Sequence, residues 1–209
     1  MSAYYLKWIA VILTIIDHVG FFLFPQYRIL RIIGRLSFPI FAFLIANGYS
    51  YTRDVKKYFL RLFIFANIIQ LPSLFMSLPV NVFYTLSLGL LCIIVADSKQ
   101  GDFTKLFEIL GIIFIGHLIG CDYGAYGIIM ILVIFMTKER YLLMSLGILV
   151  LSVLFYFKPY AWFNIQYLAA LSPFIIMFYN KKPGRKMKYF FYLFYPIHMV
   201  ILQVISQYF

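Results

Sequence analysis

The sequence predicts an all-α polytopic membrane protein with about nine transmembrane helices, forming a single integral membrane domain over residues 1–209. Of the 209 residues, 64% are apolar and 12% are charged, and the mean hydropathy is +0.93. Soluble domains are about half apolar and about a quarter charged, which excludes a water-soluble globule. Unpaired backbone amides are costly in hydrocarbon, so helices are the predicted spanning elements. Nine spans of ~20 residues each would use most of the chain and leave no room for a separate soluble domain.

Nine apolar runs, separated by charged residues or by Pro and Gly, predict these helices. The runs are Leu6–Phe24, Ile29–Tyr51, Tyr58–Met76, Val82–Ala96, Phe103–Gly120, Gly124–Thr137, Tyr141–Phe157, Trp162–Tyr179 and Tyr189–Tyr208. The first run resembles a secretory signal in position, but no small-residue cleavage site follows it, so we expect a span there.

The basic residues predict the orientation. With a cytoplasmic N-terminus, all but four of the 18 Lys and Arg residues fall in segments that face the cytoplasm, the exceptions being Arg28, Arg31, Arg35 and Lys158. We therefore expect a multi-pass protein of the cell (inner or plasma) membrane with a cytoplasmic N-terminus. The net charge of +11 is attributed to this topology and to contact with the lipid bilayer, so nucleic acid is not an expected partner. The two cysteines suggest neither a disulfide framework nor a metal site.

Ionisable residues inside the predicted spans are the candidate catalytic groups. Asp17 and His18 lie in the first run, and His18 is about 16 Å along the helix from Lys7. His198 is about 15 Å from Lys188, so both histidines are expected near the bilayer midplane. Ionisable groups at that depth are rare and indicate function. Because consecutive helical residues point about 100° apart, Asp17 is expected to pair with a polar or basic group of a neighbouring helix rather than with His18.

Two groups of basic residues are further candidates. Arg28, Arg31 and Arg35 follow an i, i+3, i+7 spacing, and Pro39 frees the backbone carbonyl of Arg35, which favours residues 34–39 as a site wall. The second group is at the predicted cytoplasmic end of the second and third spans, where it either anchors the helices or captures a phosphorylated ligand. Its members are Arg53, Lys56, Lys57 and Arg61.

Several motifs in the same order resemble the TraX family of polytopic membrane proteins. They are LKWIA through DHVG (6–20), IIGRLSFPIFAFLIANGYSYTRD (32–54), NVFYTLSLGLL (81–91), DYGAYG (122–127) and YFFYLFYPIHMVIL (189–202). That family is named for N-terminal acetylation of conjugative pilin, so the resemblance implies an acetyl-CoA-dependent membrane acyltransferase. The pattern also resembles the broader acyltransferase-three superfamily of membrane acetyltransferases, which implies that the first-span histidine, His18 here, performs the chemistry together with Arg35.

The expected function is transfer of acetyl from cytosolic acetyl-CoA, as the acyl-donor substrate, to an amine or hydroxyl of a peptide, lipid or glycan. In this hypothesis His18, Asp17, Arg35 and His198 are catalytic, and the second basic group binds the CoA phosphates. Two alternatives stay open. One is a small proton-coupled transporter that uses the buried Asp and His residues, and the other is a non-catalytic assembly factor.

Overall fold

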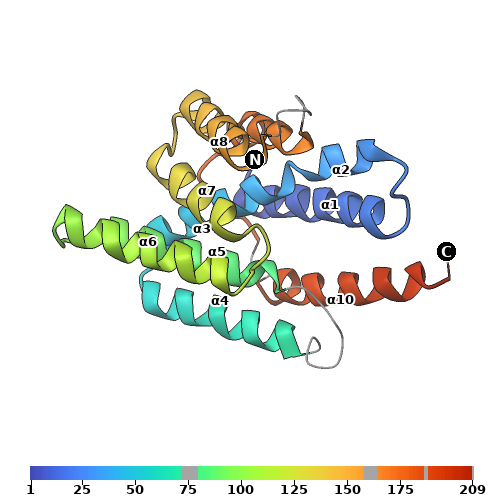
Figure 1. The fold of residues 1–209 in the computed structure, drawn as a ribbon, viewed down its shortest axis with the longest axis horizontal. Helices are drawn as coiled ribbons and strands as arrows, with labels where there is room; N and C mark the ends of the chain where they lie inside the picture. Colours follow the sequence, from blue (N-terminus) through green and yellow to red (C-terminus); the bar gives the residue numbers. More distant parts are fainter. Residues whose placement is uncertain (72–79, 158–163, 186–187, 209) are drawn as a thin grey trace. The chain divides into compact units, whose positions relative to one another are not determined.

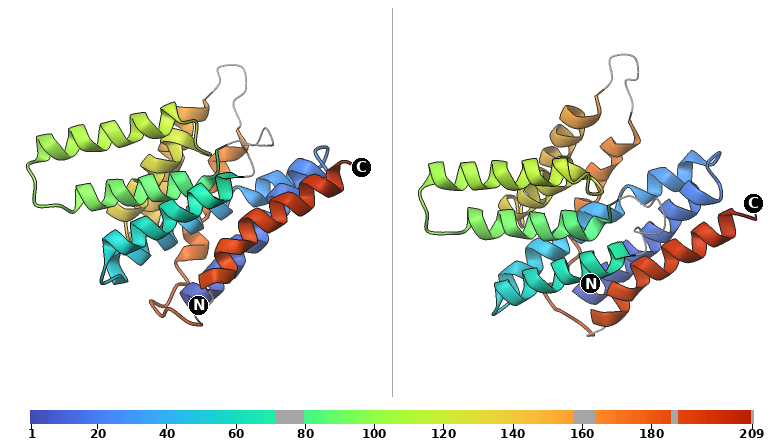
Figure 2. Two further views of the ribbon diagram at one scale, coloured as in Figure 1. Left: turned by 90° about the horizontal axis from the view of Figure 1, so that it is seen from below. Right: turned by 60° about the horizontal axis from the view of Figure 1, so that its bottom comes forward.

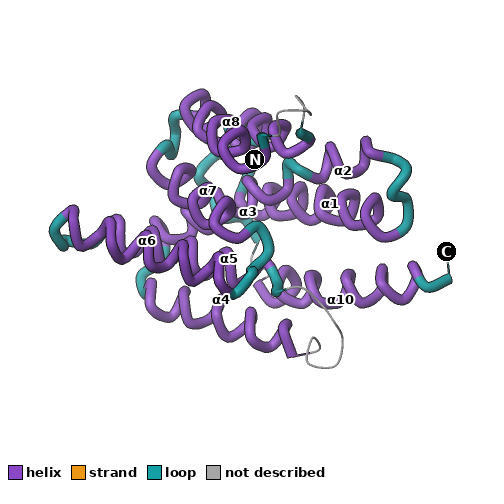
Figure 3. Tube along the Cα trace, viewed as in Figure 1, coloured by secondary structure: helices purple, strands orange, loops and turns teal. Residues whose placement is uncertain are grey.

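The computed structural model describes residues 1–71, 80–157, 164–185 and 188–208, and within these ranges it consists of helices joined by loops and turns (Figures 1 and 3). The described residues form no strand, and their one β-bridge joins Val80 to Cys121. The prediction of an all-α protein is therefore confirmed. The chain divides into two compact units, Met1–Leu44 with Thr137–Phe209, and Ile45–Met136, which we call unit 1 and unit 2.

Unit 1 is built around α1 (Ala3–Phe22), which packs against α2 (Arg28–Gly34) and α10 (Lys188–Ser206). Figure 2 shows α10, the last helix, running alongside α1, the first. Buried α1 residues recur at helical spacing along one face, and the opposite face is exposed and apolar. The remaining elements, α8 (Tyr141–Tyr156), the 3₁₀ helix η2 (Ile165–Leu171) and α9 (Pro173–Ile176), pack on one another, and η2 also contacts α2.

The second predicted span is interrupted. α2 ends at Gly34, and α3 (Ser37–Tyr51) begins after a turn at Arg35 and Leu36. Pro39 has no N–H to donate to the carbonyl of Arg35, so regular helical bonding cannot continue through this point. The irregular backbone lies within the 34–39 segment that the sequence indicated as a site wall.

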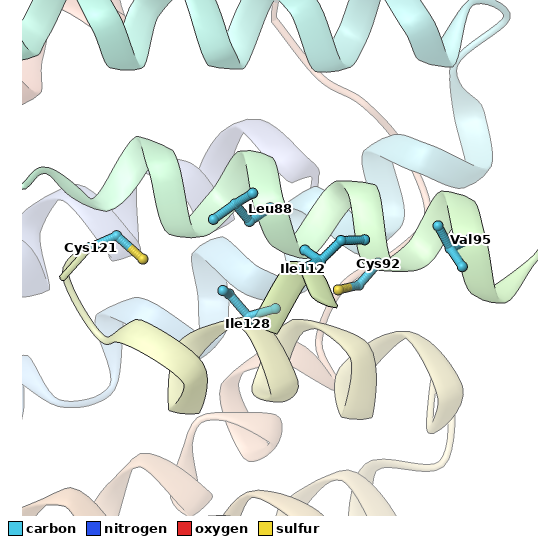
Figure 4. Packing of buried hydrophobic residues seen from close by; sticks show 6 residues of the cluster. All are labelled: Leu88, Cys92, Val95, Ile112, Cys121 and Ile128. Atoms are coloured by element: carbon cyan, nitrogen blue, oxygen red, sulfur yellow. The ribbon is translucent and has the colours of Figure 1, made fainter. Parts of the chain in front are cut away.

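Unit 2 packs three helices around α5 (Val82–Ala96), namely α4 (Val55–Gln70), α6 (Asp102–Leu118) and α7 (Gly124–Met136). Figure 4 shows part of this core, in which apolar side chains of α5 meet those of α6 and α7. The side chains drawn are Leu88, Cys92, Val95, Ile112, Cys121 and Ile128. Gly89 lets α7 approach closely, since a β-carbon there would lie 2.9 Å from that of Ile131. Both cysteines are free and buried, and they act as small apolar residues.

Helices occupy most of each predicted apolar run, and the bounds of Val82–Ala96 agree at both ends. Residues 72–76 of the third run and 162–163 of the eighth lie outside the described residues, as do Lys158 and Lys186. Two helical stretches, Ala3–Phe22 and Arg28–Tyr51, are long and apolar enough to cross a membrane, and five shorter apolar helices accompany them. Nine transmembrane helices and a cytoplasmic N-terminus therefore stay predictions.

Exposed side chains on several helices are apolar. On α6 the exposed apolar residues recur every three or four positions and so cover one helical face. They are Phe103, Leu106, Phe107, Leu110, Phe114, Ile115 and Leu118. Contiguous apolar surface of this kind is unfavourable in water and is typical of a helix that contacts lipid. This surface is membrane-protein-like, in agreement with the composition.

Candidate functional site

Asp17 is the centre of a buried charge cluster in unit 1. Its side chain is 7% exposed, and Nη2 of Arg35 lies 2.6 Å from both of its carboxylate oxygens. Nη1 of Arg31 donates to Oδ2 of Asp17 at 2.5 Å and to the Asp17 carbonyl at 3.2 Å. Nη1 of Arg35 also donates to Oε1 of Gln166, in η2, at 3.3 Å. Asp17 thus pairs with basic groups of a neighbouring helix, as the sequence indicated.

Two glycines allow α1 and α2 to approach closely enough for this pairing. A β-carbon at Gly34 would overlap the side chain of Asp17, and its three nearest atoms would all belong to that residue. A β-carbon at Gly20 would lie 2.6 Å from Cβ of Leu30. The carboxylate of Asp17 therefore lies directly against the backbone of α2, within reach of the guanidiniums of Arg31 and Arg35.

His18 and His198 form a hydrogen-bonded pair. Nδ1 of His18 lies 2.7 Å from Nε2 of His198, although the two residues are 180 positions apart in the sequence. Their rings are nearly parallel, and the His198 ring also stacks on Phe194 at 4.3 Å between centroids. Tyr195 meets both imidazoles edge-on. The two histidines, which the sequence predicts at a similar depth, are in direct contact.

The partners of His198 determine where the protons lie when both rings are neutral. Nδ1 of His198 is 2.8 Å from the carbonyl of Phe194, which can only accept, so this nitrogen carries the proton. Nε2 of His198 must then accept, and Nδ1 of His18 donates to it. The lone pair of His18 is consequently on Nε2, which has no hydrogen-bond partner among the described residues. In this tautomer Nε2 is the nitrogen of His18 that can accept a proton.

The second basic group lies in unit 2, at the beginning of α4. Asp54 caps this helix by accepting from the backbone N–H of Lys57 at 2.9 Å, so the helix starts at Val55 and Arg53 precedes it. Only Lys56, Lys57 and Arg61 are on α4 itself. The N–H of Lys57 and its ammonium group, 3.1 Å from the carboxylate, lower the pKa of Asp54, which stays ionised. The four basic residues still exceed the single acid, and the exposed helix start carries positive charge.

The structure brings Asp17, His18, Arg35 and His198 together within unit 1, whereas Arg53, Lys56, Lys57 and Arg61 belong to unit 2. Two contributors were missed by the sequence reasoning. Arg31 was recognised only as part of a basic face. Gln166 was not singled out, although a buried glutamine in an apolar run is an unusual feature that could have identified it.

Comparison with known proteins identifies the family. The family described as TraX protein matches residues 2–206 of the chain. The chain belongs to the TraX family. This TraX family chain is 31% identical to the "Probable fimbrial assembly protein FimC, serogroup H1" of Dichelobacter nodosus, over 96% of its own length and 94% of that protein's. It is also 36% identical to an uncharacterized protein of Rickettsia prowazekii (strain Madrid E), over 40% of its own length and 33% of that protein's. No solved structure matches the chain.

Proposed function

We propose that this TraX family protein is a membrane acyltransferase that transfers acetyl from cytosolic acetyl-CoA to an amine or hydroxyl of a peptide, lipid or glycan. The observation that carries the proposal is the oriented histidine pair, because the contact with His198 leaves the lone pair of His18 on Nε2, which has no hydrogen-bond partner among the described residues. A general base needs this combination of a fixed ring and an accessible lone pair. The partner that orients His18 is a second histidine rather than a carboxylate.

In the proposed reaction, Nε2 of His18 removes the proton from the acceptor N–H or O–H as the acceptor attacks the thioester carbonyl. The C–S bond of the tetrahedral intermediate then breaks, and the CoA thiolate leaves with the proton from His18 as free thiol. The acceptor has gained acetyl, and His18 has returned to its starting form.

Arg35 and Asp17 have an electrostatic role in this proposal. The developing oxyanion is favoured by fixed positive charge and by backbone dipoles near the break between α2 and α3. Asp17 engages the guanidinium of Arg35, so its part is to position that charge rather than to accept the proton of the acceptor. The same contacts keep a cation inside a predicted span, where an unpaired guanidinium would be costly.

Acetyl-CoA is proposed to dock by its phosphates on Arg53, Lys56, Lys57 and Arg61. Arginine and lysine are the usual phosphate ligands, and three of these four side chains are exposed. Replacing Arg53 and Lys57 together by Gln should weaken acetyl-CoA binding, measured by equilibrium dialysis with labelled ligand. The matched control replaces Lys99 and Lys105, two basic residues of the same unit near the start of α6, by Gln. If the two double variants bind acetyl-CoA with equal affinity, Arg53 and Lys57 act as membrane anchors and not as CoA ligands.

The decisive experiment replaces the proposed base. Purified His18→Ala protein is mixed with labelled acetyl-CoA, and CoA release and label transfer to protein, peptide and lipid fractions are followed. We expect transfer to fall by at least about a hundredfold while CoA binding and thermal stability are retained, since general-base catalysis contributes about 10²–10⁴-fold. The control is His117→Ala, which alters an exposed histidine near the end of α6. Full activity in folded His18→Ala protein would refute the assignment.

A role in pilus assembly without catalysis is the second candidate, and it is favoured by the printed name of the Dichelobacter relative. The two functions differ in their dependence on His18. In a piliated host that requires this protein, an assembly factor would support normal piliation when carrying His18→Ala. The acyltransferase would not support it if the acetyl group is needed on the pilus subunit.

A further inference from the structure

The outward side of α4 has the residue spacing of a helix–helix seam. α4 packs on α5 at the edge of unit 2 (Figure 1), and its buried residues are Leu62 and Ala66. On the exposed side, four residues follow one another at intervals of four, three and four positions, which is the spacing of a heptad seam. We call this set the α4 seam, and its three apolar members are each more than half exposed. Its residues are Leu60, Ile64, Asn67 and Leu71.

Asn67 is the polar member of the α4 seam. It is about 15 Å along the helix from Lys57, which places it near the midplane of the predicted third span. The exposed residues beside it, Phe63, Ile64 and Ile68, are apolar. A polar amide that faces lipid at that depth is unfavourable, whereas asparagine side chains commonly form hydrogen bonds between helices inside membranes. Asn67 therefore indicates that another helix, rather than lipid, covers this side of α4.

The amide of Asn67 retains hydrogen-bonding capacity for such a partner. Its Nδ2 donates to the carbonyl of Phe63 at 2.7 Å, and its Oδ1 accepts from the hydroxyl of Tyr84, in α5, at 3.1 Å. A side-chain amide has two N–H donors and an oxygen with two lone pairs. One donor and one lone pair of Asn67 are therefore without a partner among the described residues. The two bonds that are made restrict rotation of the amide, so the remaining donor and acceptor have a fixed orientation.

The charge distribution of the amide favours a second copy of this chain as the partner. The N–H groups carry partial positive charge and the oxygen carries partial negative charge, so the amide is complementary to an identical amide. In a two-fold symmetric dimer within one membrane, the two α4 helices run parallel and the two Asn67 side chains meet at the same depth. Each amide can then donate to the oxygen of the other. A single polar residue in an apolar seam also fixes the register, since a shifted pairing would place each amide against apolar side chains.

We propose that the α4 seam is a symmetric interface with a second copy of this chain, in which the two Asn67 amides exchange hydrogen bonds. The proposal depends on the predicted membrane span and not on acyl transfer. The four residues of the seam are separate from the proposed catalytic residues and from the proposed CoA ligands. The interface and the activity can therefore be tested independently.

Disulfide cross-linking in membranes tests the contact directly. Cys92 and Cys121 are replaced by Ala, and a single cysteine is introduced at Ile64, at Asn67 or, as the control, at Leu110 on the exposed face of α6. Oxidation should join two full-length chains through Ile64→Cys and through Asn67→Cys, because facing residues of a seam come within disulfide reach. Leu110→Cys should remain monomeric. The proposal is wrong if neither seam position joins two copies, if the seam is joined only to a protein of different mass, or if the control cross-links equally.

Energy transfer between full-length chains in phosphatidylcholine vesicles measures the affinity with both native cysteines present. Donor and acceptor labels are carried on a terminal tag, and the dimer fraction is followed as the protein-to-lipid ratio changes. Asn67→Leu keeps the approximate side-chain volume and removes the amide, so it should raise the dissociation constant roughly tenfold, as loss of two interhelical hydrogen bonds does in membranes. Leu110→Ala should leave the constant unchanged. An absence of concentration-dependent energy transfer in the wild type, or equal constants for the wild type and Asn67→Leu, would overturn the proposal.

Discussion

Replacing Gly34 by Ala tests whether the Asp17 cluster has the geometry described above. Gly34 is the last residue of α2, and a β-carbon there would overlap the side chain of Asp17, with Cγ of Asp17 2.5 Å away. The atoms in the way belong to a short side chain that two arginines hold in place, so they cannot rotate aside without losing those contacts. We therefore expect the substitution to displace the carboxylate.

The expected cost follows from three contributions. Overpacking costs about 1–3 kcal/mol, and disrupting a buried ion pair costs about 3–5 kcal/mol when the pair is fully broken. Alanine is favoured over glycine in a helix by about 0.5–1 kcal/mol, which opposes both terms. With the pair partly broken, the net loss is about 2–4 kcal/mol, and at about 2–4 °C per kcal/mol this lowers the melting temperature by roughly 5–15 °C.

The measurement is thermal unfolding in detergent, followed by the amount of monodisperse protein that remains after heating. Gly111→Ala in α6 is the matched control, because a β-carbon at that position meets nothing within 4 Å. It should be neutral or slightly stabilising. If Gly34→Ala melts at or above the temperature of Gly111→Ala, the close approach of Asp17 to α2 is wrong, and the charge cluster argued from it must be abandoned.

Three further predictions follow from other parts of the molecule. His198→Ala should reduce acetyl transfer by about tenfold, as loss of an orienting partner does, and should move the pH profile of kcat/KM; an unchanged profile would contradict the positioning role. Asn81→Ala should destabilise the protein by about 1–2 kcal/mol, since it removes the cap of α5 and a buried amide that donates to the Ala66 carbonyl at 2.9 Å. The control Asn67→Ala, on the exposed side of α4, should lower the stability less. In a cysteine-free background, a single cysteine at Lys182 should be labelled from the cytoplasm and one at Lys158 from outside. Reversed labelling would invert the predicted topology and the side of CoA entry.

Apolar runs located the helices well, because a helix that contacts lipid and a helix that is buried in a core both need a continuous apolar sequence. Val82–Ala96 is the clearest case, since α5 is buried on most sides and begins at a capping asparagine, Asn81. The prediction was too coarse for Trp162–Tyr179, where a single helix was expected. The described part contains η2, started by Asn164, and the one-turn α9, started by Pro173. Composition alone did not distinguish these short pieces from a continuous span.

The site was predictable only to the level of single residues. The depth of His18 and His198 followed from the helical rise, but their contact depends on how α10 packs against α1. Likewise, periodicity placed Arg28, Arg31 and Arg35 on one face, whereas Asp17 engages only the last two. Which side chains meet is decided by tertiary packing, and in this cluster it depends on the close approach of α1 and α2.

The contact between the first and last helices can form only late in biosynthesis. His198 emerges 180 residues after His18, which at about 5–20 residues per second corresponds to roughly 10–40 s of translation. During that interval the nascent chain contains His18 without the histidine that pairs with it. The histidine pair can therefore form only after α10 has been synthesised, and a chain that ends before α10 contains His18 without its partner.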